Sequence, residues 1–486
     1  MAKKEGLKKN FLYSIGYQIL VIILPLITAP YVSRTLGAEM VGIYSVTQAF
    51  ANYFYLFAML GINNYGNRTI AQVRDDKEKM SRVFWEMFVF QCITAMIVSL
   101  AYIGYCGIFV KHDKLIYLMQ AFYVLSGVFD INWFCFGIEK FKLTTLRSTI
   151  VRLITAVCIF VFVRDTNDLW IYTLIMASSF LFSALVVWPF VLKNVYIVRP
   201  TWEGIKQHIK PNLVLFWPVI AVSLYNIMDK LMLDWISTKQ EVAFYTYAER
   251  IVQIPNTLIL ALDNVVMPRM SNIFASGDKQ NAKKMMSNVM LFAMFTSAAM
   301  AFGLAGVAKV FAPWFYGEEF IRCGQFILML SPILIFKSWA GALRTQYIIP
   351  AGKDKIYVLS LTIGAVVNLI ANVLLIPKLL GTGAVIGTIL AELSVAVIQF
   401  YMTRHELAIG EYLKNGFGLC VIGLIMFFCV KAVSYMHFSP PIILCLQIVV
   451  GGVVYVTFAG IYMVKIRKNP IIINECLKML HIKKRF

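Results

Sequence analysis

Ionisable side chains inside long apolar segments are the residues of this sequence best suited to chemistry. A charge in the middle of an apolar run is costly to place in hydrocarbon, so it faces a cavity, an opposite charge or a ligand. Arg presents a planar fork of donors and Lys a point charge to an anion such as phosphate, whereas a carboxylate can bind a cation or a proton. The residues of this kind are Asp130, Asp229, Lys230, Glu249, Arg250, Asp263, Lys337 and Glu392, with Arg34 at a helix end.

Two acid–base neighbours in this set, Asp229–Lys230 and Glu249–Arg250, do not neutralise each other. Adjacent residues on a helix point about 100° apart, so neither pair meets face to face. The spacing therefore favours a ligand for Arg250 and Lys230 over a purely structural pair, although both interpretations stay open. Lys337 is a candidate of the same kind.

Glu392 and Arg34 each have competing interpretations. Glu392 lies mid-helix, where a carboxylate is protonated or paired, so it either couples to a proton or pairs with a buried cation. Arg34 ends the first apolar segment, where its long side chain either contacts an anion or extends to the membrane surface.

A set of oxygen-bearing residues suggests a site for a monovalent cation. Asn368 and Asn372 lie four residues apart, as do Ala384 and Thr388, so each pair shares one helix face. With the Asp229 carboxylate, these amide, hydroxyl and backbone oxygens would form a cage of charge −1, which suits Na⁺. The alternative is that the two Asn side chains form hydrogen bonds between helices and stabilise their packing.

Composition shows where these residues must lie. The 486-residue chain is 60% hydrophobic and 14% charged, against about 25% charged in an average soluble domain. Its mean hydropathy is +0.73. These values exclude a soluble enzyme and indicate a polytopic membrane protein. The net charge of +20 comes from short connectors, as membrane topology requires, and does not indicate nucleic-acid binding.

Cysteine and histidine predict no metal centre or disulfide. The nine Cys contain no CxxC pair and lie mostly in apolar runs, and the five His share no cluster. Packing is therefore the expected role of the cysteines. The sequence predicts no resident cofactor and no catalytic group.

Apolar runs predict fourteen transmembrane helices with both termini in the cytoplasm. Most of the 45 Lys and Arg residues fall in connectors on one side, which becomes the cytoplasmic side. The basic N-terminus before Phe11 resembles a signal anchor that stays as the first helix. The predicted ranges are 11–33, 41–63, 83–109, 115–138, 147–163, 169–192, 212–236, 242–267, 285–311, 321–347, 355–376, 384–403, 415–436 and 441–464.

A weak internal repeat divides these helices into two lobes. At an offset of 201 residues, four residues recur, and the even number of helices per copy gives both copies the same orientation. We therefore expect an N-lobe at 1–200 (helices 1–6), a C-lobe at 201–410 (helices 7–12) around a central cavity, helices 13–14 at 411–464 and a basic tail at 465–486. The tail is either a surface amphipathic helix or a solvated end. The repeated residues are Val41, Tyr44, Asn63 and Arg68 against Val242, Tyr245, Asn264 and Arg269.

Prolines within the predicted helices predict kinks. Pro25 in helix one and Pro218 in helix seven occupy equivalent helices of the two lobes, and Pro332 interrupts helix ten. Each proline removes a backbone hydrogen bond. The kinks are either static or bend as the cavity changes its opening.

Three segments in this order resemble oligosaccharide flippases of the Wzx, or polysaccharide transporter, type. That family belongs to the multidrug/oligosaccharidyl-lipid/polysaccharide (MOP) exporters, with the lipid II flippase and MATE drug exporters as relatives. Together with the fourteen-helix layout, the resemblance covers nearly the whole chain. The segments are 24–44 (LPLITAP, RTLG and GIY), 133–140 (WFCFGIEK) and 225–232 (YNIMDKLM).

The resemblance implies the transfer of undecaprenyl-diphosphate-linked sugar repeats from the inner to the outer leaflet of the cytoplasmic membrane. It implies a cationic cavity in which Arg250, Lys230, Lys337 and Arg34 contact the head group, and no enzymatic step. The cation set resembles the sodium site of the lipid II flippases, but Asn372 stands where those proteins can carry a second carboxylate. Na⁺ or H⁺ is the expected coupling ion, and the expected partners are the lipid-linked oligosaccharide, membrane lipid and other polysaccharide assembly proteins.

Two other functions stay open at this stage. A MATE-type exporter of cationic drugs would favour a net-acidic cavity, whereas the buried residues here carry both signs. A membrane glycan polymerase or ligase would need a large outer loop, and the predicted outer connectors are short. The residues carry no code for a particular sugar.

Overall fold

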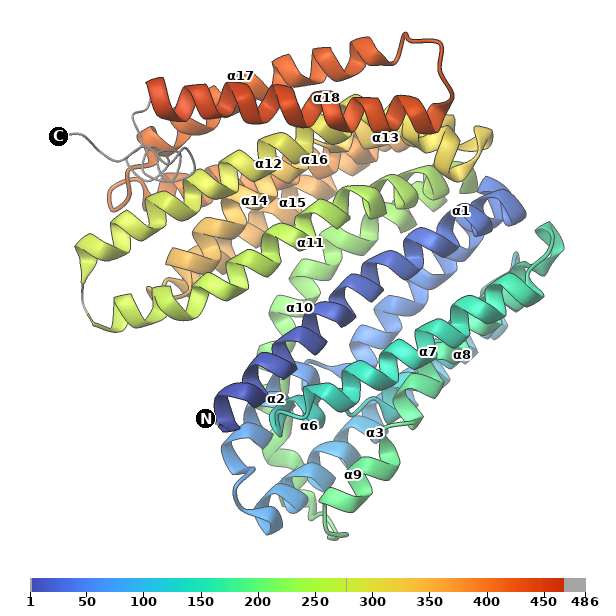
Figure 1. Cartoon of the computed structure of the whole chain (residues 1–486). Helices are drawn as coiled ribbons and strands as arrows, with labels where there is room; N and C mark the ends of the chain where they lie inside the picture. The colour runs from blue at the N-terminus through green and yellow to red at the C-terminus, as the bar shows by residue number, and fades with distance from the viewer. Residues whose placement is uncertain (1, 277, 467–486) are drawn as a thin grey trace. The chain divides into compact units, whose positions relative to one another are not determined.

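The computed structural model describes residues 2–276 and 278–466, and within them the fold consists of helices without strands (Figure 1). Short 3₁₀ or π turns join several of the helices. The α-helices are α1 (Ala2–Met59), α2 (Ile62–Val73), α3 (Lys77–Ile108), α4 (Lys114–Met119), α5 (Ala121–Phe129), α6 (Asn132–Gly137), α7 (Phe141–Phe162), α8 (Leu169–Leu185), α9 (Trp188–Asn194), α10 (Trp202–Ile236), α11 (Lys239–Ala275), α12 (Lys279–Tyr316), α13 (Ile321–Leu330), α14 (Ile333–Leu343), α15 (Asp354–Leu379), α16 (Gly381–Thr403), α17 (Ile409–Val433) and α18 (Pro440–Ile461).

The all-helical fold and its membrane character are confirmed. Among the described residues, eight helices are long and apolar enough to cross a membrane, or nine if the bent pair α13–α14 counts as one span. A chain with so many such helices is a multi-pass membrane protein. The fourteen crossings of the sequence analysis remain a prediction. The tail beyond residue 466 lies outside the described residues.

A single residue replaces the predicted connector between the first two helices. Helical backbone runs from Ala2 to Met59 and is interrupted only at Gly37, whose φ of 75° and ψ of 171° are not helical. A side chain at this φ is strained, so glycine suits the break. The expected loop at 34–40 is therefore a sharp break, and Arg34 lies just before it.

Other breaks follow from local sequence. Pro332 separates α13 from α14, and the two helices meet at 43°, as expected for a residue that removes a backbone hydrogen bond. Asp130 separates α5 from α6 in extended backbone. Pro25 and Pro30 lie inside α1 without ending it.

The chain divides into two compact units, residues 1–243 and 244–486. This division places α10 in the first unit, whereas the sequence analysis begins the C-lobe at residue 201. The six-helix lobes of the sequence analysis remain a prediction, and each unit is described here by itself.

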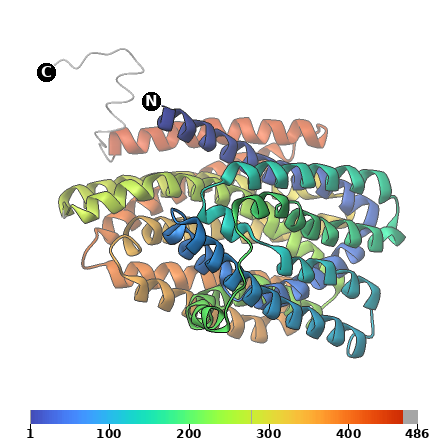
Figure 2. The ribbon, with the colours of Figure 1, turned by 90° about the horizontal axis from the view of Figure 1, so that it is seen from below.

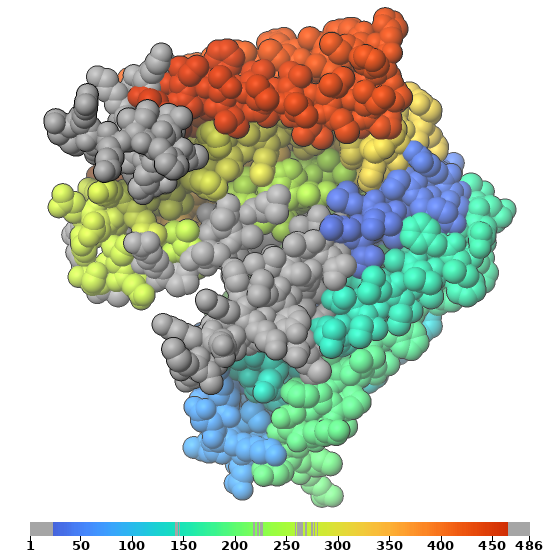
Figure 3. Space-filling model, in the orientation of Figure 1, coloured from blue at the N-terminus to red at the C-terminus, as the bar shows by residue number. Residues whose placement is uncertain are grey.

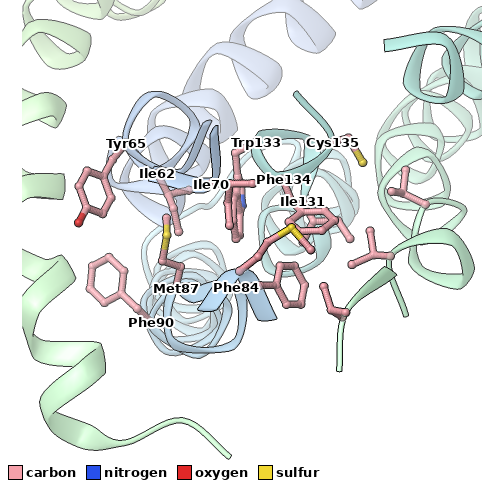
Figure 4. Close-up of a cluster of buried hydrophobic side chains, with 14 of the residues drawn as sticks. Ile62, Tyr65, Ile70, Phe84, Met87, Phe90, Ile131, Trp133, Phe134 and Cys135 are labelled. Atoms are coloured by element: carbon pink, nitrogen blue, oxygen red, sulfur yellow. The ribbon is translucent and has the colours of Figure 1, made fainter. Parts of the chain in front are cut away.

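Unit 1 has an aromatic core built by α2, α3 and α6 (Figure 4). Phe84 of α3 packs edge-on to Phe134 of α6 with ring centroids 4.9 Å apart. Trp133 is fully buried and its indole nitrogen donates to the Gln91 side chain at 2.8 Å, which satisfies its polar end. In unit 2, α17 and α18 lie side by side along α12 (Figures 1 and 2).

Helix α7 begins earlier than expected. The sequence analysis predicts a helix over 147–163, and in the structure this helix already begins at Phe141. Arg147 and Arg152 are therefore helical residues. Arg147 is buried, and its guanidinium donates to the Asn132 side chain at 3.0 Å.

Candidate functional site

Unit 1 holds three of the predicted site residues on α1 and α10. Asp229 is 1% exposed and interacts electrostatically with Tyr53 of α1. The Tyr53 hydroxyl donates to the backbone oxygen of Ser223 at 3.3 Å, which joins α1 to α10. Lys230 is half-buried beside Asp229, and Arg34 is exposed. Asp229 is thus a deeply buried acid held against α1.

Asp130 is built into the break between α5 and α6. The Tyr55 hydroxyl donates to Asp130 Oδ2 at 2.7 Å, and the Asn132 backbone nitrogen donates to Oδ1 at 3.0 Å. Gln91 of α3 donates to the Asp130 backbone oxygen at 2.9 Å. Both the Asp130 carboxylate and the Asp130 backbone oxygen at the break therefore accept hydrogen bonds from within the protein, which indicates a structural role for Asp130.

A second buried acid in unit 1 was not predicted from the sequence. Glu86 of α3 and His208 of α10 are each 3% exposed, with Glu86 Oε2 3.4 Å from His208 Nε2. Tyr65 of α2 bonds to His208 Nδ1 at 2.9 Å, and Gln207 donates to Glu86 at 3.3 Å. Burial lowers the pKa of His208, while the contact with Glu86 acts in the opposite direction.

Only weak signals in the sequence could have revealed this cluster. Glu86 stands near the start of a predicted helix, and His208 falls in a predicted connector, so neither stands out as an intramembrane charge. Gly204 lies so close to Glu86 that a Cβ at this position would come within 1.9 Å of the carboxylate. That close approach is visible only in three dimensions.

In unit 2 the structure places Lys337 of α14 against Glu392 of α16. Lys337 Nζ lies 3.2 Å from Glu392 Oε1, and the side chains are 24% and 5% exposed. This geometry agrees with the interpretation in which Glu392 pairs with a buried cation. Lys337 and Glu392 are therefore an ion pair between α14 and α16.

The amide and hydroxyl residues proposed for a cation meet between α15 and α16. Asn372 donates to the Asn368 side-chain oxygen at 3.2 Å, and the Thr388 hydroxyl donates to the Ala384 backbone oxygen at 2.9 Å. Tyr245 of α11 bonds to Thr388 at 2.9 Å. These four residues therefore share one region of unit 2, while Asp229 belongs to unit 1.

Close packing of α16 on α15 depends on a glycine. A Cβ at Gly387 would lie 2.2 Å from Asn372 Oδ1, which is far inside contact distance. Asn368 and Asn372 are both buried. The missing side chain at Gly387 thus lets the two amides sit at the helix interface.

Arg250 lies at an aromatic wall of α11 and α12. Its Cζ is 5.3 Å from the centroid of the Tyr247 ring, a cation–π distance. Tyr247 in turn packs against Tyr316 and Phe320, with centroids 4.7 and 5.4 Å away. Arg250 and Glu249 are half-buried. The aromatic wall packs against one side of Arg250, whose guanidinium has the planar donor geometry that suits phosphate.

Taken together, the predicted residues form separate groups. Unit 1 holds Arg34, Asp130, Asp229 and Lys230, and unit 2 holds the rest. Within the described residues, no three His, Cys, Asp or Glu side chains come together as a metal site. These groups include cationic side chains, which are suited to an anion, and side-chain oxygens, which are suited to a small cation.

These features define a multi-pass helical membrane protein with buried charges. The fold is similar to a solved lipid II flippase MurJ in an inward closed conformation, with a TM-score of 0.79 and 14% identity over 93% of this chain and 99% of that one. The fold is also similar to an inward-facing MATE multidrug transporter, with a TM-score of 0.63 and 15% identity over 80% of this chain and 96% of that one.

Residues 7–274, more than half of the chain, match the family model described as polysaccharide biosynthesis protein, and the chain belongs to that family. A putative O-antigen transporter of Escherichia coli (strain K12) is 28% identical over 275 residues, which is 55% of this chain and 66% of the relative. A putative O-antigen transporter of Shigella dysenteriae is 23% identical over 399 residues, which is 81% of this chain and 99% of the relative.

Proposed function

We propose that this protein flips lipid-linked oligosaccharide from the inner to the outer leaflet of the cytoplasmic membrane. The substrate is a diphosphate-linked sugar repeat on a long isoprenoid, undecaprenyl diphosphate. Its polar head cannot cross hydrocarbon unaided, while its tail never has to leave the lipid. The task requires a wet, cationic passage and alternating access, and no bond is made or broken.

The observation that carries this proposal is the agreement of family and fold. The family match covers residues 7–274, and relatives named as O-antigen transporters align over up to 81% of the chain. The likeness to the solved lipid II flippase extends over 93% of the chain. A MATE-type drug exporter is the second candidate, supported by the lower fold similarity of 0.63.

The membrane arrangement proposed with this function has fourteen crossings, two six-helix lobes around a central cavity and both termini in the cytoplasm. Basic connectors support the orientation. The break at Gly37 supports it too, because it divides α1 into two segments, each more than 20 residues long. A crossing takes about 20 residues.

Arg250 is the leading candidate for contact with the diphosphate, followed by Lys230. A guanidinium beside an aromatic wall presents a planar donor fork to phosphate oxygens. Lys337 would contact the head group if the head group displaced Glu392. Arg34 would contact the head group at the outer end of the passage. Na⁺ coupling would use Asp229 with Asn368, Asn372, Ala384 and Thr388, and proton coupling would use Glu392.

A chromosomal deletion tests the function. Cells without the protein should accumulate lipid-linked repeats that only a probe of the cytoplasmic face can reach, and the wild-type gene should restore export. Single repeats on the outer face would indicate a polymerase, and an unchanged glycan with new drug sensitivity would indicate a MATE exporter. Either result would overturn the proposal.

Complementation with variants tests the site. R250Q should reduce export at least tenfold, because a charged hydrogen bond to phosphate contributes about 1.5–3 kcal/mol. R164Q is the matched control, since Arg164 is exposed and its side chain donates to the backbone of Val161. Equal export by R250Q and wild type, at equal protein levels, would remove Arg250 from the site.

A further inference from the structure

Unit 1 contains a pocket whose lining includes none of the residues proposed for transport. It lies between α1, α7 and α8 and has a volume of about 150 Å³. In Figure 3, α1 (blue) and α7 (teal) adjoin on one face of this unit. Most of the pocket wall is apolar, and the polar part consists of one guanidinium and five hydroxyls, from Thr28, Ser148, Arg152, Thr155, Ser179 and Ser183.

Arg152 supplies the positive charge of the pocket. It makes no hydrogen bond, ion pair or ring contact with the residues that the structure describes, and it is exposed. Arg147, one and a half turns earlier on α7, is instead buried and bonded to Asn132 and Ser148. The two arginines of α7 therefore differ: Arg147 is part of the protein interior, and Arg152 has its donors available for an anion.

The hydroxyls divide into acceptors and donors. Thr28, Thr155 and Ser179 each donate to a carbonyl of their own helix, at 3.1, 2.8 and 2.7 Å, so their free lone pairs accept from a ligand. Ser148 accepts from Arg147 at 3.2 Å, which leaves its own hydrogen to donate. The pocket thus offers donors for a phosphate and acceptors for hydroxyl groups of the same ligand.

The charged end of the pocket, at Arg152, lies near the basic end of α7. The sequence from Leu153 to Phe162 is apolar apart from Thr155, whereas Lys140, Lys142, Arg147 and Arg152 make the preceding stretch basic. Arg152 therefore stands where the hydrocarbon-facing part of the helix ends. In the proposed topology this is the inner leaflet, whose anionic lipids attract basic pockets between helices.

We propose that this pocket binds the head group of an anionic phospholipid, a monoanionic phosphodiester esterified to a polyol, as in phosphatidylglycerol. Arg152 and Ser148 hold the phosphate, and the back-bonded hydroxyls accept from the polyol. The volume of 150 Å³ admits a phosphate with a small alcohol and is too small for a diphosphate bearing several sugars. The bound lipid would tie α1 to α7 and α8. The level of the pocket rests on the proposed topology, but lipid binding is separate from flipping.

The test uses the full-length protein in nanodiscs of phosphatidylcholine doped with phosphatidylglycerol, with bound lipid counted by native mass spectrometry. R152Q should bind phosphatidylglycerol about tenfold more weakly, the usual effect of losing a charged hydrogen bond. R199Q is the control, because Arg199 is exposed, lies in the same unit and does not line the pocket. Equal binding by R152Q and wild type, or equal loss in R152Q and R199Q, overturns the site.

A second variant and a competitor sharpen the outcome. S148A/S183A keeps the charge and removes two hydroxyls, so it should weaken binding about threefold. Excess isoprenyl diphosphate should leave phosphatidylglycerol bound. One-for-one displacement would assign the pocket to the transported substrate and overturn the proposal. Because binding is counted without transport, a failure of the flippase function would leave this result unaffected.

Discussion

Glu392 in unit 2 and Glu86 in unit 1 are both buried carboxylates, and the two units satisfy them differently. In unit 2, Glu392 is 4% exposed and lies 3.2 Å from the ammonium of Lys337. In unit 1, Glu86 is 3% exposed and its neighbours are His208 at 3.4 Å and the neutral amide of Gln207 at 3.3 Å. One acid thus faces a permanent cation and the other a titratable imidazole.

The difference bears on what each group can do. The Lys–Glu pair can be separated by a competing ion or by a movement of α14 against α16. The charge of an imidazole depends on pH, and burial lowers the pKa of His208 below its ordinary value near 6.5, so its contact with Glu86 responds to pH without any movement. The pair in unit 2 is therefore a mechanical or ligand-driven contact, and the cluster in unit 1 is a pH-responsive one.

Removing the lysine should give the largest effect. K337M leaves the Glu392 carboxylate buried without its cation, which costs about 3–5 kcal/mol in comparable buried pairs. The double variant K337M/E392M removes both charges and should recover most of that loss. Thermal unfolding of purified protein in detergent measures both. A K337M variant as stable as wild type would show that Glu392 does not need the pair.

The same double variant separates structure from transport. If Lys337 serves only the pair, K337M/E392M should fold and export glycan normally. If Lys337 also contacts the diphosphate, or Glu392 carries a coupling proton, the double variant should be stable but inactive. Export at equal protein levels distinguishes these outcomes.

The sequence could identify the first of these pairs and not the second. Lys337 and Glu392 stand out because each interrupts an apolar run, which is visible without a fold. Glu86 and His208 lie near helix ends, and only the packing of α3 on α10 joins them. Arg152 was missed for a related reason, since its basic surroundings resemble a connector although α7 already begins at Phe141.

The helices themselves followed from the sequence because hydrocarbon requires long apolar runs with every backbone group bonded. Breaks were harder to place. Pro332 could be foreseen from its missing donor, but Asp130 breaks a helix through contacts with Tyr55 and Gln91 that arise only from packing. For the same reason, the meeting of α15 and α16 at Gly387 could not be read from residue spacing.

Acidification should produce the next effect, and only in unit 1. Burial lowers the pKa of His208 from its ordinary value near 6.5, so the unfolded chain takes up the proton first as pH falls. The stability contributed by neutral His208 is complete above about pH 6.5 and declines as pH drops through the lowered pKa. Melting temperatures between pH 8 and pH 5 should show this decline, and H208Q should flatten it.

H405Q is the control for this titration. His405 is exposed and contacts only the neighbouring Arg404 among the described residues, so its loss should leave the pH dependence unchanged. A pH dependence that persists in H208Q would assign it to another group. The groups facing His208 are Glu86 of α3 and Tyr65 of α2.

The smallest effect should come from the hydroxyl of Tyr65. Y65F removes the 2.9 Å hydrogen bond to His208 Nδ1 while the ring stays packed in the core of unit 1, so the loss should be about 0.5–1.5 kcal/mol. Y105F is a matched control, because the Tyr105 hydroxyl bonds to no described residue.

The pH dependence of Y65F is more informative than its stability. When Tyr65 donates to Nδ1, the proton of neutral His208 sits on Nε2, toward Glu86. Without that donor the imidazole can take the other tautomer, which weakens the contact with Glu86 and makes protonation the remaining way to restore it. Y65F should therefore begin to lose stability at a different pH from wild type. An identical pH profile in Y65F would show that Tyr65 does not set the tautomer, leaving Glu86 alone to orient the ring.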